Sequence, residues 1–279
     1  MKKKKIIITL IIALLITSAL WVIWADTALQ LNTYAVYSSS IPKSFDGYRI
    51  AHISDLHNTE IGKNNETLLE MIAEADPDII AITGDMIDSR NTNVEVALQF
   101  AEKAVEIAPC YYVCGNHESR VSEYEDLKIG LIERGVAVLE NTVAEIERGD
   151  EKIMLIGVVD PTFDLSANAE TVMEKNLNEY ADIGDFKLLL SHRPELFDVY
   201  VKNNMNLVLS GHAHGGQFRL PFIGGMYAPA QGLFPEYYEG SYKSENTEMI
   251  VSRGIGNSII PIRFNNRPEV ILIELKYQY

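Results

Sequence analysis

The chain has 279 residues, of which 47% are hydrophobic and 23% are charged, a composition typical of a globular protein with one large or two small domains. Its formal charge is -15 at pH 7, although lysines occupy positions 2–5. This acidity argues against a protein that binds the phosphate backbone of nucleic acids, so we expect no nucleic-acid partner. It is equally expected for a soluble acidic surface and for carboxylates that bind cations.

The N-terminal segment is apolar. Residues 6–24 carry no charge and, as a helix, would extend roughly the 30 Å of a bilayer's hydrocarbon core. Trp21 and Trp24 lie at its far end, where aromatic rings favour the membrane interface, and the lysines before it should stay cytoplasmic. A cleaved signal peptide is the alternative, but its apolar region is usually shorter. We predict a lysine-rich stub and single-pass anchor over 1–29 in the cell membrane, and one extracytoplasmic domain over 30–279.

Strand-like and helix-like segments alternate beyond the anchor. The apolar strands are nearly continuous, which is typical of sheets covered on both faces. The pattern predicts an α/β (α+β) fold with two packed sheets flanked by helices. The predicted strands are 29–39, 48–54, 78–83, 110–114, 186–191, 205–210, 249–256 and 269–277, the helices are 65–75, 94–108 and 123–135, and a hairpin over 141–159 turns at 148–150.

The two cysteines, Cys110 and Cys114, are four residues apart. If they lie on one strand, their Cα atoms are about 13 Å apart, which is too far for a disulfide. We expect both to be buried packing residues.

Side chains that can bind metals follow directly after five of the apolar strands. They are Asp55, His57, Asp85, Asn116, His117, Glu118, His192, His212 and His214, and they include five of the six histidines. Ligands in α/β sheets bind beyond the carboxyl ends of strands, so we expect these residues to converge. The pairs in "SDLH" and "GHAH" would face one side if their backbone is extended.

The convergent donors suit two divalent metal ions. Carboxylate, imidazole and amide groups together favour Mn, Fe or Zn. Seven of these residues are candidate ligands: Asp55, His57, Asp85, Asn116, His192, His212 and His214. Seven are too many for one ion, but they divide over two ions if a carboxylate bridges them. Glycines 84, 115, 211, 215 and 216 remove side chains where the chain turns beside the site.

The motifs "SDLH", "GD", "GNHE", "SH" and "GHAH" occur in an order and spacing that resembles the calcineurin-like metallophosphoesterases, from about residue 48 to the end of the chain. The segments "GHAHGGQFRLP" and "VSRGIG…PIRFNNRPEVILIEL" are similar to a bacterial membrane-associated branch of that family. This branch includes phosphodiesterases and a lipid pyrophosphatase that cleaves a UDP-linked diacyl sugar. The resemblance implies a four-layer αββα sandwich with two mixed β-sheets.

The resemblance also implies roles for individual residues. It assigns Asp55, His57 and His214 to one metal, Asn116, His192 and His212 to the other, and Asp85 to both as the bridge. Water activated between the ions would attack the phosphorus atom. His117 would then donate a proton or hydrogen bond to the leaving oxygen, with Glu118 orienting its ring.

Other polar residues have two readings. His52 lies within its strand, where packing or support of a ligand is favoured over metal contact. Asp88 either supports a ligand or caps the following segment. Arg193, Arg253 and Arg263 either contact a substrate phosphate or form surface ion pairs.

The sequence departs from the protein-phosphatase branch of the family at "DSRN". That branch carries an arginine in a "DRG" run after its "GD" motif, whereas here Arg90 is displaced by one residue and the glycine is missing. This argues against a protein phosphatase. The aromatic segment 218–242 forms either a loop packed on its own core or an exposed lid that contacts lipid.

These patterns predict a membrane-anchored phosphoesterase that cleaves phosphodiester or pyrophosphate bonds of a phospholipid or cell-envelope precursor. A broad phosphomonoesterase or nucleotide hydrolase is the alternative of the same class. A non-catalytic, membrane-tethered metal-binding module is the alternative from another class. The oligomeric state has no signature in the sequence.

Overall fold

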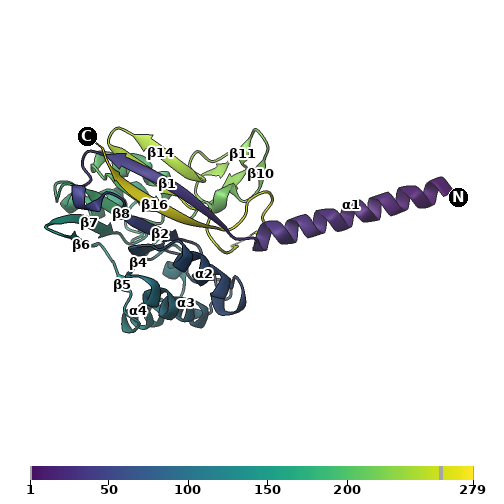
Figure 1. Ribbon diagram of the computed structural model, residues 1–279, viewed down its shortest axis with the longest axis horizontal. Coiled ribbons are helices and arrows are strands. Elements are labelled where there is room, and N and C mark those ends of the chain that lie inside the picture. The colour runs from purple at the N-terminus through teal and green to yellow at the C-terminus, as the bar shows by residue number, and fades with distance from the viewer. Residues whose placement is uncertain (1, 258–259, 279) are drawn as a thin grey trace.

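A computed structural model of the chain describes residues 2–257 and 260–278; Met1, Ser258, Ile259 and Tyr279 lie outside the described residues. Helix α1 (Lys2–Thr27) projects from the globular part (Figure 1). It is apolar around its whole circumference, and none of its most apolar 18-residue window is buried against the protein. By length and composition it is the one described helix able to cross a membrane, as predicted for residues 6–24.

The first six-stranded sheet, sheet A, has the strand order β1-β16-β2-β3-β4-β5. It is mixed, because β16 is antiparallel to β2 while the other neighbouring strands are parallel. Its strands are β1 (Gln30–Ser38), β2 (Arg49–Ile53), β3 (Ile79–Thr83), β4 (Cys110–Val113), β5 (Ala137–Val138) and β16 (Glu269–Tyr277).

The second six-stranded sheet, sheet B, has the order β14-β15-β9-β8-β7-β6. Its two outer pairs are antiparallel and its three inner pairs are parallel. Its strands are β6 (Thr142–Arg148), β7 (Glu151–Gly157), β8 (Lys187–Leu190), β9 (Leu207–Ser210), β14 (Gly240–Ser244) and β15 (Thr247–Val251). Two small hairpins lie outside both sheets: β10 (Arg219–Leu220) pairs with β11 (Gly224–Gly225), and β12 (Tyr227–Ala228) pairs with β13 (Gly232–Leu233).

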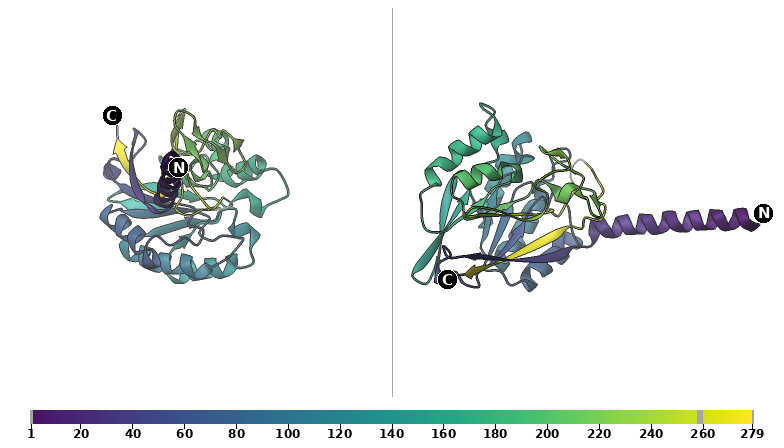
Figure 2. Two further views of the ribbon diagram at one scale, coloured as in Figure 1. Left: turned by 90° about the vertical axis from the view of Figure 1, so that its right-hand side faces the viewer. Right: turned by 90° about the horizontal axis from the view of Figure 1, so that it is seen from above.

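Three hydrophobic cores separate four layers. The two sheets enclose one core, which explains why strands such as β3 are buried along their whole length. The outer face of sheet A packs on α2 (Glu66–Glu74), α3 (Val94–Ile107) and α4 (Tyr124–Glu133), and that of sheet B on α5 (Ala169–Leu177) and α6 (Phe197–Lys202). Figure 2 shows these helices on opposite sides of the molecule. The predicted αββα sandwich is confirmed.

The predicted elements are found where the apolar pattern is strong. All three predicted helices and the hairpin at residues 148–150 are present, and both cysteine thiols are buried and free. The two-residue strand β5 and the half-exposed β14 were missed, because neither has an apolar run. The predicted strand over 249–256 ends at Val251, where the chain turns away through a bend.

We predict that Leu190→Ala in β8 lowers the free energy of unfolding by about 2–5 kcal/mol, because Leu190 is fully buried between the sheets and its truncation leaves a cavity. Ile132→Ala on the exposed side of α4 is the control, with an expected change within about 0.5 kcal/mol. Urea unfolding followed by circular dichroism measures both. Equal effects would show that the core between the sheets is not closely packed.

Candidate metal centre

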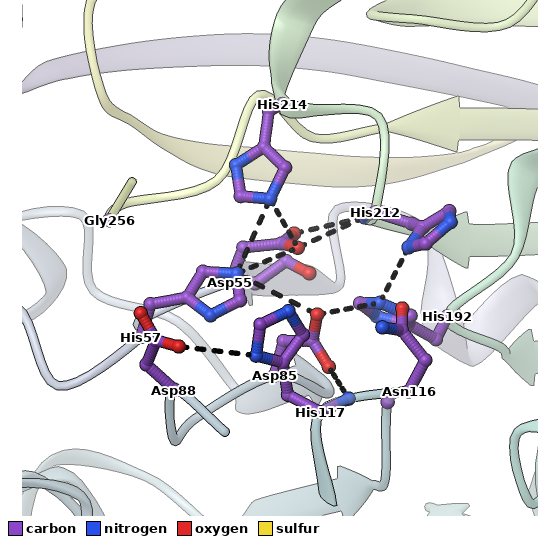
Figure 3. Close-up of polar contacts among 12 residues, drawn as sticks. Asp55, His57, Asp85, Asp88, Asn116, His117, His192, His212, His214 and Gly256 are labelled. Carbon is purple, nitrogen blue, oxygen red and sulfur yellow. Dashed lines mark hydrogen bonds and ion pairs between the residues drawn. The ribbon is translucent and has the colours of Figure 1, made fainter. Parts of the chain in front are cut away.

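All seven predicted metal ligands converge at one edge of the two sheets (Figure 3). Each follows the carboxyl end of a strand: β2, β3 and β4 in sheet A, and β8 and β9 in sheet B. The sheets are joined there by hydrogen bonds. The ring Nδ1–H of His192 donates to the carbonyl of Thr83 over 2.7 Å, and the backbone N–H of His212 donates to the carboxylate of Asp55 over 3.0 Å. Residues as far apart in the sequence as Asp55 and His214 thus meet in one cluster.

The backbone at the site is not extended. The prediction that the two ligands of "SDLH" and of "GHAH" face one side because they lie on extended chain is therefore wrong. Asp55, His57, Asp85, His212 and His214 all have positive φ, between 46° and 67°. Side chains disfavour this left-handed region, although Asp and His tolerate it better than most residues. Each such residue costs of the order of 1–3 kcal/mol, which the surrounding structure must offset. The tight left-handed turns, and not a pleat, direct the side chains inward.

Two of the predicted glycines are required by close approach. A Cβ atom at Gly115 would lie 2.2 Å from Oδ1 of Asp85, and one at Gly211 would lie 2.3 Å from Oδ2 of Asp55. Any other residue at either position would displace a carboxylate of the site.

The first cluster contains Asp55, His57 and His214, whose nearest ligand atoms lie within 4.8 Å of one another. The Nε2 atoms of the two histidines are 3.3 Å apart, and they lie 3.7 and 3.5 Å from Oδ1 of Asp55. All three side chains are buried. The three groups face a common point.

The second cluster contains Asp85, His192 and His212 within the same limit. Nε2 of His192 lies 3.2 Å from Oδ2 of Asp85 and 3.2 Å from Nδ1 of His212. The same Asp85 oxygen is 3.6 Å from Nε2 of His57. Asp85 therefore lies between the two clusters, and the histidines of "GHAH" belong one to each.

The site has the negative charge and the unpartnered oxygen atom expected of a cation site. Burial acts to raise the pKa of Asp85, but the charge of His192, its hydrogen bond and the charge of His57 lower that pKa well below its ordinary value. An ionised carboxylate that is 1% exposed needs positive charge beside it. The amide Oδ1 of Asn116 is buried and has no hydrogen-bond partner among the described residues. Two carboxylates, four imidazoles and this oxygen form a donor set that fits two divalent ions.

The predicted role of Glu118 as the group that orients His117 is wrong. Its Oε1 accepts the backbone N–H groups of Met86 and Ile87, and its Oε2 accepts those of Asp85 and Gly115, over 2.8–3.3 Å. A buried carboxylate with four N–H donors holds the loops after β3 and β4 together. Glu118 thus fixes the backbone from which Asp85 projects.

His117 is oriented by the loop after β3. The backbone N–H of Ser89 donates to Nδ1 of His117 over 3.0 Å, so the ring proton resides on Nε2. Burial lowers the pKa of His117 to about 4, which keeps the ring neutral at pH 7. Asp88 lies 3.6 Å from the same Nδ1 without a proton between them, and it accepts the N–H of Arg90, so it caps its own turn.

His52 supports the site from behind, as predicted. Its Nε2 lies 2.8 Å from the hydroxyl of Thr83, the residue whose carbonyl accepts the hydrogen bond from His192. Burial lowers the pKa of His52 to about 3, so the ring is neutral.

Arg193 is buried, so it does not form the surface ion pair considered for it. Its guanidinium forms a bidentate pair with Asp160 at 2.6 and 3.1 Å, and its Nη1 lies 2.9 Å from Nε2 of His212. Asp160 is 2% exposed and was missed from the sequence. It follows the buried strand β7, so the rule that identified the other site residues would have found it.

A cavity of about 310 Å³ opens above the clusters. Its lining includes Arg193 and the exposed Arg120, which was also missed because nothing in "GNHESR" distinguishes it from a surface arginine. A second cavity of about 610 Å³ shares Thr162, Arg193 and Ala230 with the first. The site thus extends as a groove away from the metal ligands.

The other two arginines considered for phosphate contact lie elsewhere. Arg263 is fully buried and donates to the carbonyls of Arg253 and Gly256. Arg253 pairs with Glu239 and lies near Glu269. Both hold the loops after β15 together. Arg90 pairs with Asp88 and does not line the cavity.

Two face-to-face mixed sheets with adjoining Asp and His clusters at their carboxyl ends define a dinuclear metallohydrolase. Residues 48–216 match the family model of the calcineurin-like phosphoesterases, and the chain belongs to that family. It is accordingly a metal-dependent phosphoester hydrolase.

Several proteins are similar in sequence to this chain over most of its length. The uncharacterized metallophosphoesterase YkuE of Bacillus subtilis (strain 168) is 30% identical over 89% of this chain and 86% of its own length. Phosphodiesterase YaeI of Escherichia coli (strain K12) is 28% identical over 82% of each chain. A transmembrane protein with metallophosphoesterase domain from Danio rerio is 29% identical over 95% of this chain, which spans 62% of that protein.

The solved structure of TT1561 from Thermus thermophilus has the same fold. It superposes with a TM-score of 0.50 at 15% identity, over 75% of this chain and 90% of that one.

We predict that Glu118→Gln destabilises the protein by about 1–3 kcal/mol, because an amide offers one acceptor oxygen and turns its NH₂ group toward two backbone donors. Glu125→Gln on the exposed surface of α4 is the matched control and should leave stability unchanged. Thermal unfolding compares the two variants. Equal stability of the Glu118 variant and the unsubstituted chain would contradict the role given to this carboxylate.

Proposed function

We propose that this chain is a membrane-anchored, dinuclear-metal phosphodiesterase or pyrophosphatase that acts on a phospholipid or cell-envelope precursor. The observation that carries the proposal is the position of Asp85 between two adjoining clusters of buried ligands. In this proposal one ion is held by Asp55, His57 and His214, the other by Asn116, His192 and His212, and Asp85 contributes to both.

The divalent ions, when bound, supply positive charge that polarises a phosphoryl group and lowers the pKa of water. The chain's own residues place the substrate. Arg193 is fixed by Asp160 and lines the cavity, and Arg120 adds a second guanidinium there, so both favour an anionic ester. In the proposal His117, with its proton on Nε2, donates a hydrogen bond to the leaving oxygen.

The shape of the groove supports a diester or pyrophosphate over a small monoester. A monoester carries one substituent on phosphorus, whereas a diester or pyrophosphate needs space for substituents on both sides. The 310 Å³ cavity at the ligands and the adjoining 610 Å³ cavity offer two such spaces. The similarity to phosphodiesterase YaeI agrees with this choice.

The N-terminal helix supports a membrane location. In the proposal, residues 1–29 form the stub and anchor, residues 30–279 form the catalytic domain, and the lysines stay on the cytoplasmic side, which places the domain outside. An enzyme held at a bilayer meets lipid-linked esters at high local concentration, which favours such substrates.

We predict that the Asp85→Asn variant binds fewer divalent ions than the unsubstituted chain, which should bind about two per chain. The reason is that the substitution removes the one charge shared by both clusters. Elemental analysis by mass spectrometry measures this after loading with manganese. Asp88→Asn is the control, since Asp88 contacts Arg90 and His117 but belongs to neither cluster, and it should retain both ions. Full metal content in the Asp85 variant would exclude it as the bridge.

We predict that His117→Asn lowers turnover of bis-p-nitrophenyl phosphate by roughly 10²–10³-fold while leaving metal content intact, as expected when a hydrogen-bond donor to the leaving oxygen is lost. Steady-state kinetics with manganese measures the loss. Undiminished turnover would remove His117 from the reaction. Absence of turnover in the unsubstituted chain with any divalent ion, despite bound metal, would favour the non-catalytic module.

A panel of lipid-linked diesters, soluble diesters and phosphomonoesters tests the substrate class. The proposal requires that lipid-linked diesters or pyrophosphates have the highest kcat/KM. A preference for monoesters or nucleotides would replace it with the broad-specificity alternative.

A further inference from the structure

The globular domain is joined to α1 without a flexible linker. Only Ala28 and Leu29 separate the helix from β1, and Arg267 donates to both of their carbonyls over 2.6 and 2.7 Å. The guanidinium of Arg267 also lies over the ring of Trp24, 4.8 Å from its centroid. Leu29 is buried in the core beside sheet A. The end of α1 is thus fixed against the domain.

A second set of contacts connects this junction to the two small hairpins. The carboxylate of Asp26 accepts the backbone N–H of Arg263 over 2.6 Å. The next residue, Phe264, exchanges backbone hydrogen bonds with the segment that leads into β10 (Arg219–Leu220). The hairpin formed by β10 and β11 (Gly224–Gly225) therefore lies beside the end of α1, as Figures 1 and 2 show.

The hairpin tips expose large apolar side chains. Phe222 is fully exposed between β10 and β11, and Leu233 and Phe234 are 70% and 62% exposed at the end of β12–β13 (Tyr227–Ala228 and Gly232–Leu233). The apolar tips, as we call them, consist of Leu220, Phe222, Ile223, Leu233, Phe234, Ile262 and Phe264, each at least 36% exposed. An apolar surface of this extent on a charged, acidic domain marks a contact site.

The same segment forms a wall of the catalytic site. Pro229 and Ala230 line the cavity above the metal ligands. The backbone N–H of Met226 donates to the carbonyl of Gly216 over 3.0 Å, two residues beyond His214. Apolar tips and catalytic ligands are thus linked by one short, hydrogen-bonded stretch.

From this arrangement we infer that the apolar tips insert into the surface of the bilayer that α1 spans and hold the mouth of the catalytic groove at the depth of the lipid headgroups. The lipid surface is the occupant that the geometry favours, because the rigid junction at Trp24, an interfacial residue, brings the hairpins beside the emerging helix. The inference rests on the proposed membrane anchor and adds a second membrane contact, made by residues outside α1.

Single cysteines labelled with the environment-sensitive fluorophore NBD test the inference in the full chain, reconstituted in phosphatidylcholine–phosphatidylglycerol vesicles. The positions are Phe222→Cys and Phe234→Cys at the tips, Leu14→Cys within α1, and Tyr37→Cys as an exposed control. Tyr37 lies at the far end of β1, about 23 Å from the junction. The natural cysteines are buried, and the unsubstituted chain treated with NBD is the blank.

Insertion predicts blue-shifted emission and quenching by lipids with spin-labelled acyl chains at residues 222, 234 and 14, and neither effect at Tyr37. Quenching at Leu14 without quenching at the tips would overturn the inference and leave the anchor intact. No quenching at Leu14 would remove the anchor and the inference together. Shielding of the tips from water without quenching by lipid would indicate a protein contact and also overturn it.

Substitution of the tips separates membrane docking from catalysis. Phe222→Gln with Phe234→Gln should leave turnover of soluble bis-p-nitrophenyl phosphate unchanged and lower turnover of a diester carried in the same vesicles. Equal turnover of the vesicle-borne diester by the substituted and unsubstituted chains would refute a role of the tips in substrate access.

Discussion

The structure depends on the burial of two carboxylates, Asp55 and Asp85, which are 0% and 1% exposed. Ionised carboxylates in such surroundings are costly unless positive charge and hydrogen-bond donors accompany them. The fold supplies backbone donors through the N–H groups of His117 and His212, and it gathers imidazoles and an amide oxygen around the same point. The hydrogen-bond donors leave negative charge on the two carboxylates to be balanced, and for this reason the site fits divalent cations.

The polypeptide holds this arrangement with strained backbone. Five of the seven ligand residues occupy the left-handed region, and their loops are fixed across strand ends by hydrogen bonds such as Asp55 N–H to the carbonyl of Gly84 and His57 N–H to that of Asp85. Glu118 adds four further bonds to two of these loops. These hydrogen bonds hold the loops of the proposed ligands, which limits the conformational entropy that ion binding would remove.

Sequence patterns predicted the layers of the fold and the convergence of the candidate ligands, because both follow from the positions of apolar runs and of the polar residues after them. Continuous apolar runs such as 79–83 require burial on both faces, and a polar residue directly after such a run lies at the functional edge. The backbone conformation of the ligands was predicted wrongly, since spacing alone does not distinguish a pleat from a left-handed turn. The partners of Glu118 could not be predicted either, because they are backbone amides brought close only by tertiary packing, whereas Asp160, the partner of Arg193, follows a buried strand and could have been found.

The position of β1 has a consequence for how the chain acquires its structure. This strand follows α1 closely, yet its neighbour in sheet A is β16, the last of the described strands, with Gln30 opposite Glu269. The hydrogen-bonding edge of β1 therefore stays open until β16 has been synthesised, and this part of the sheet forms through a contact between segments far apart in the sequence. Such long sequence separation slows folding, because the entropy of closing the long loop is lost before the strand pairing compensates for it.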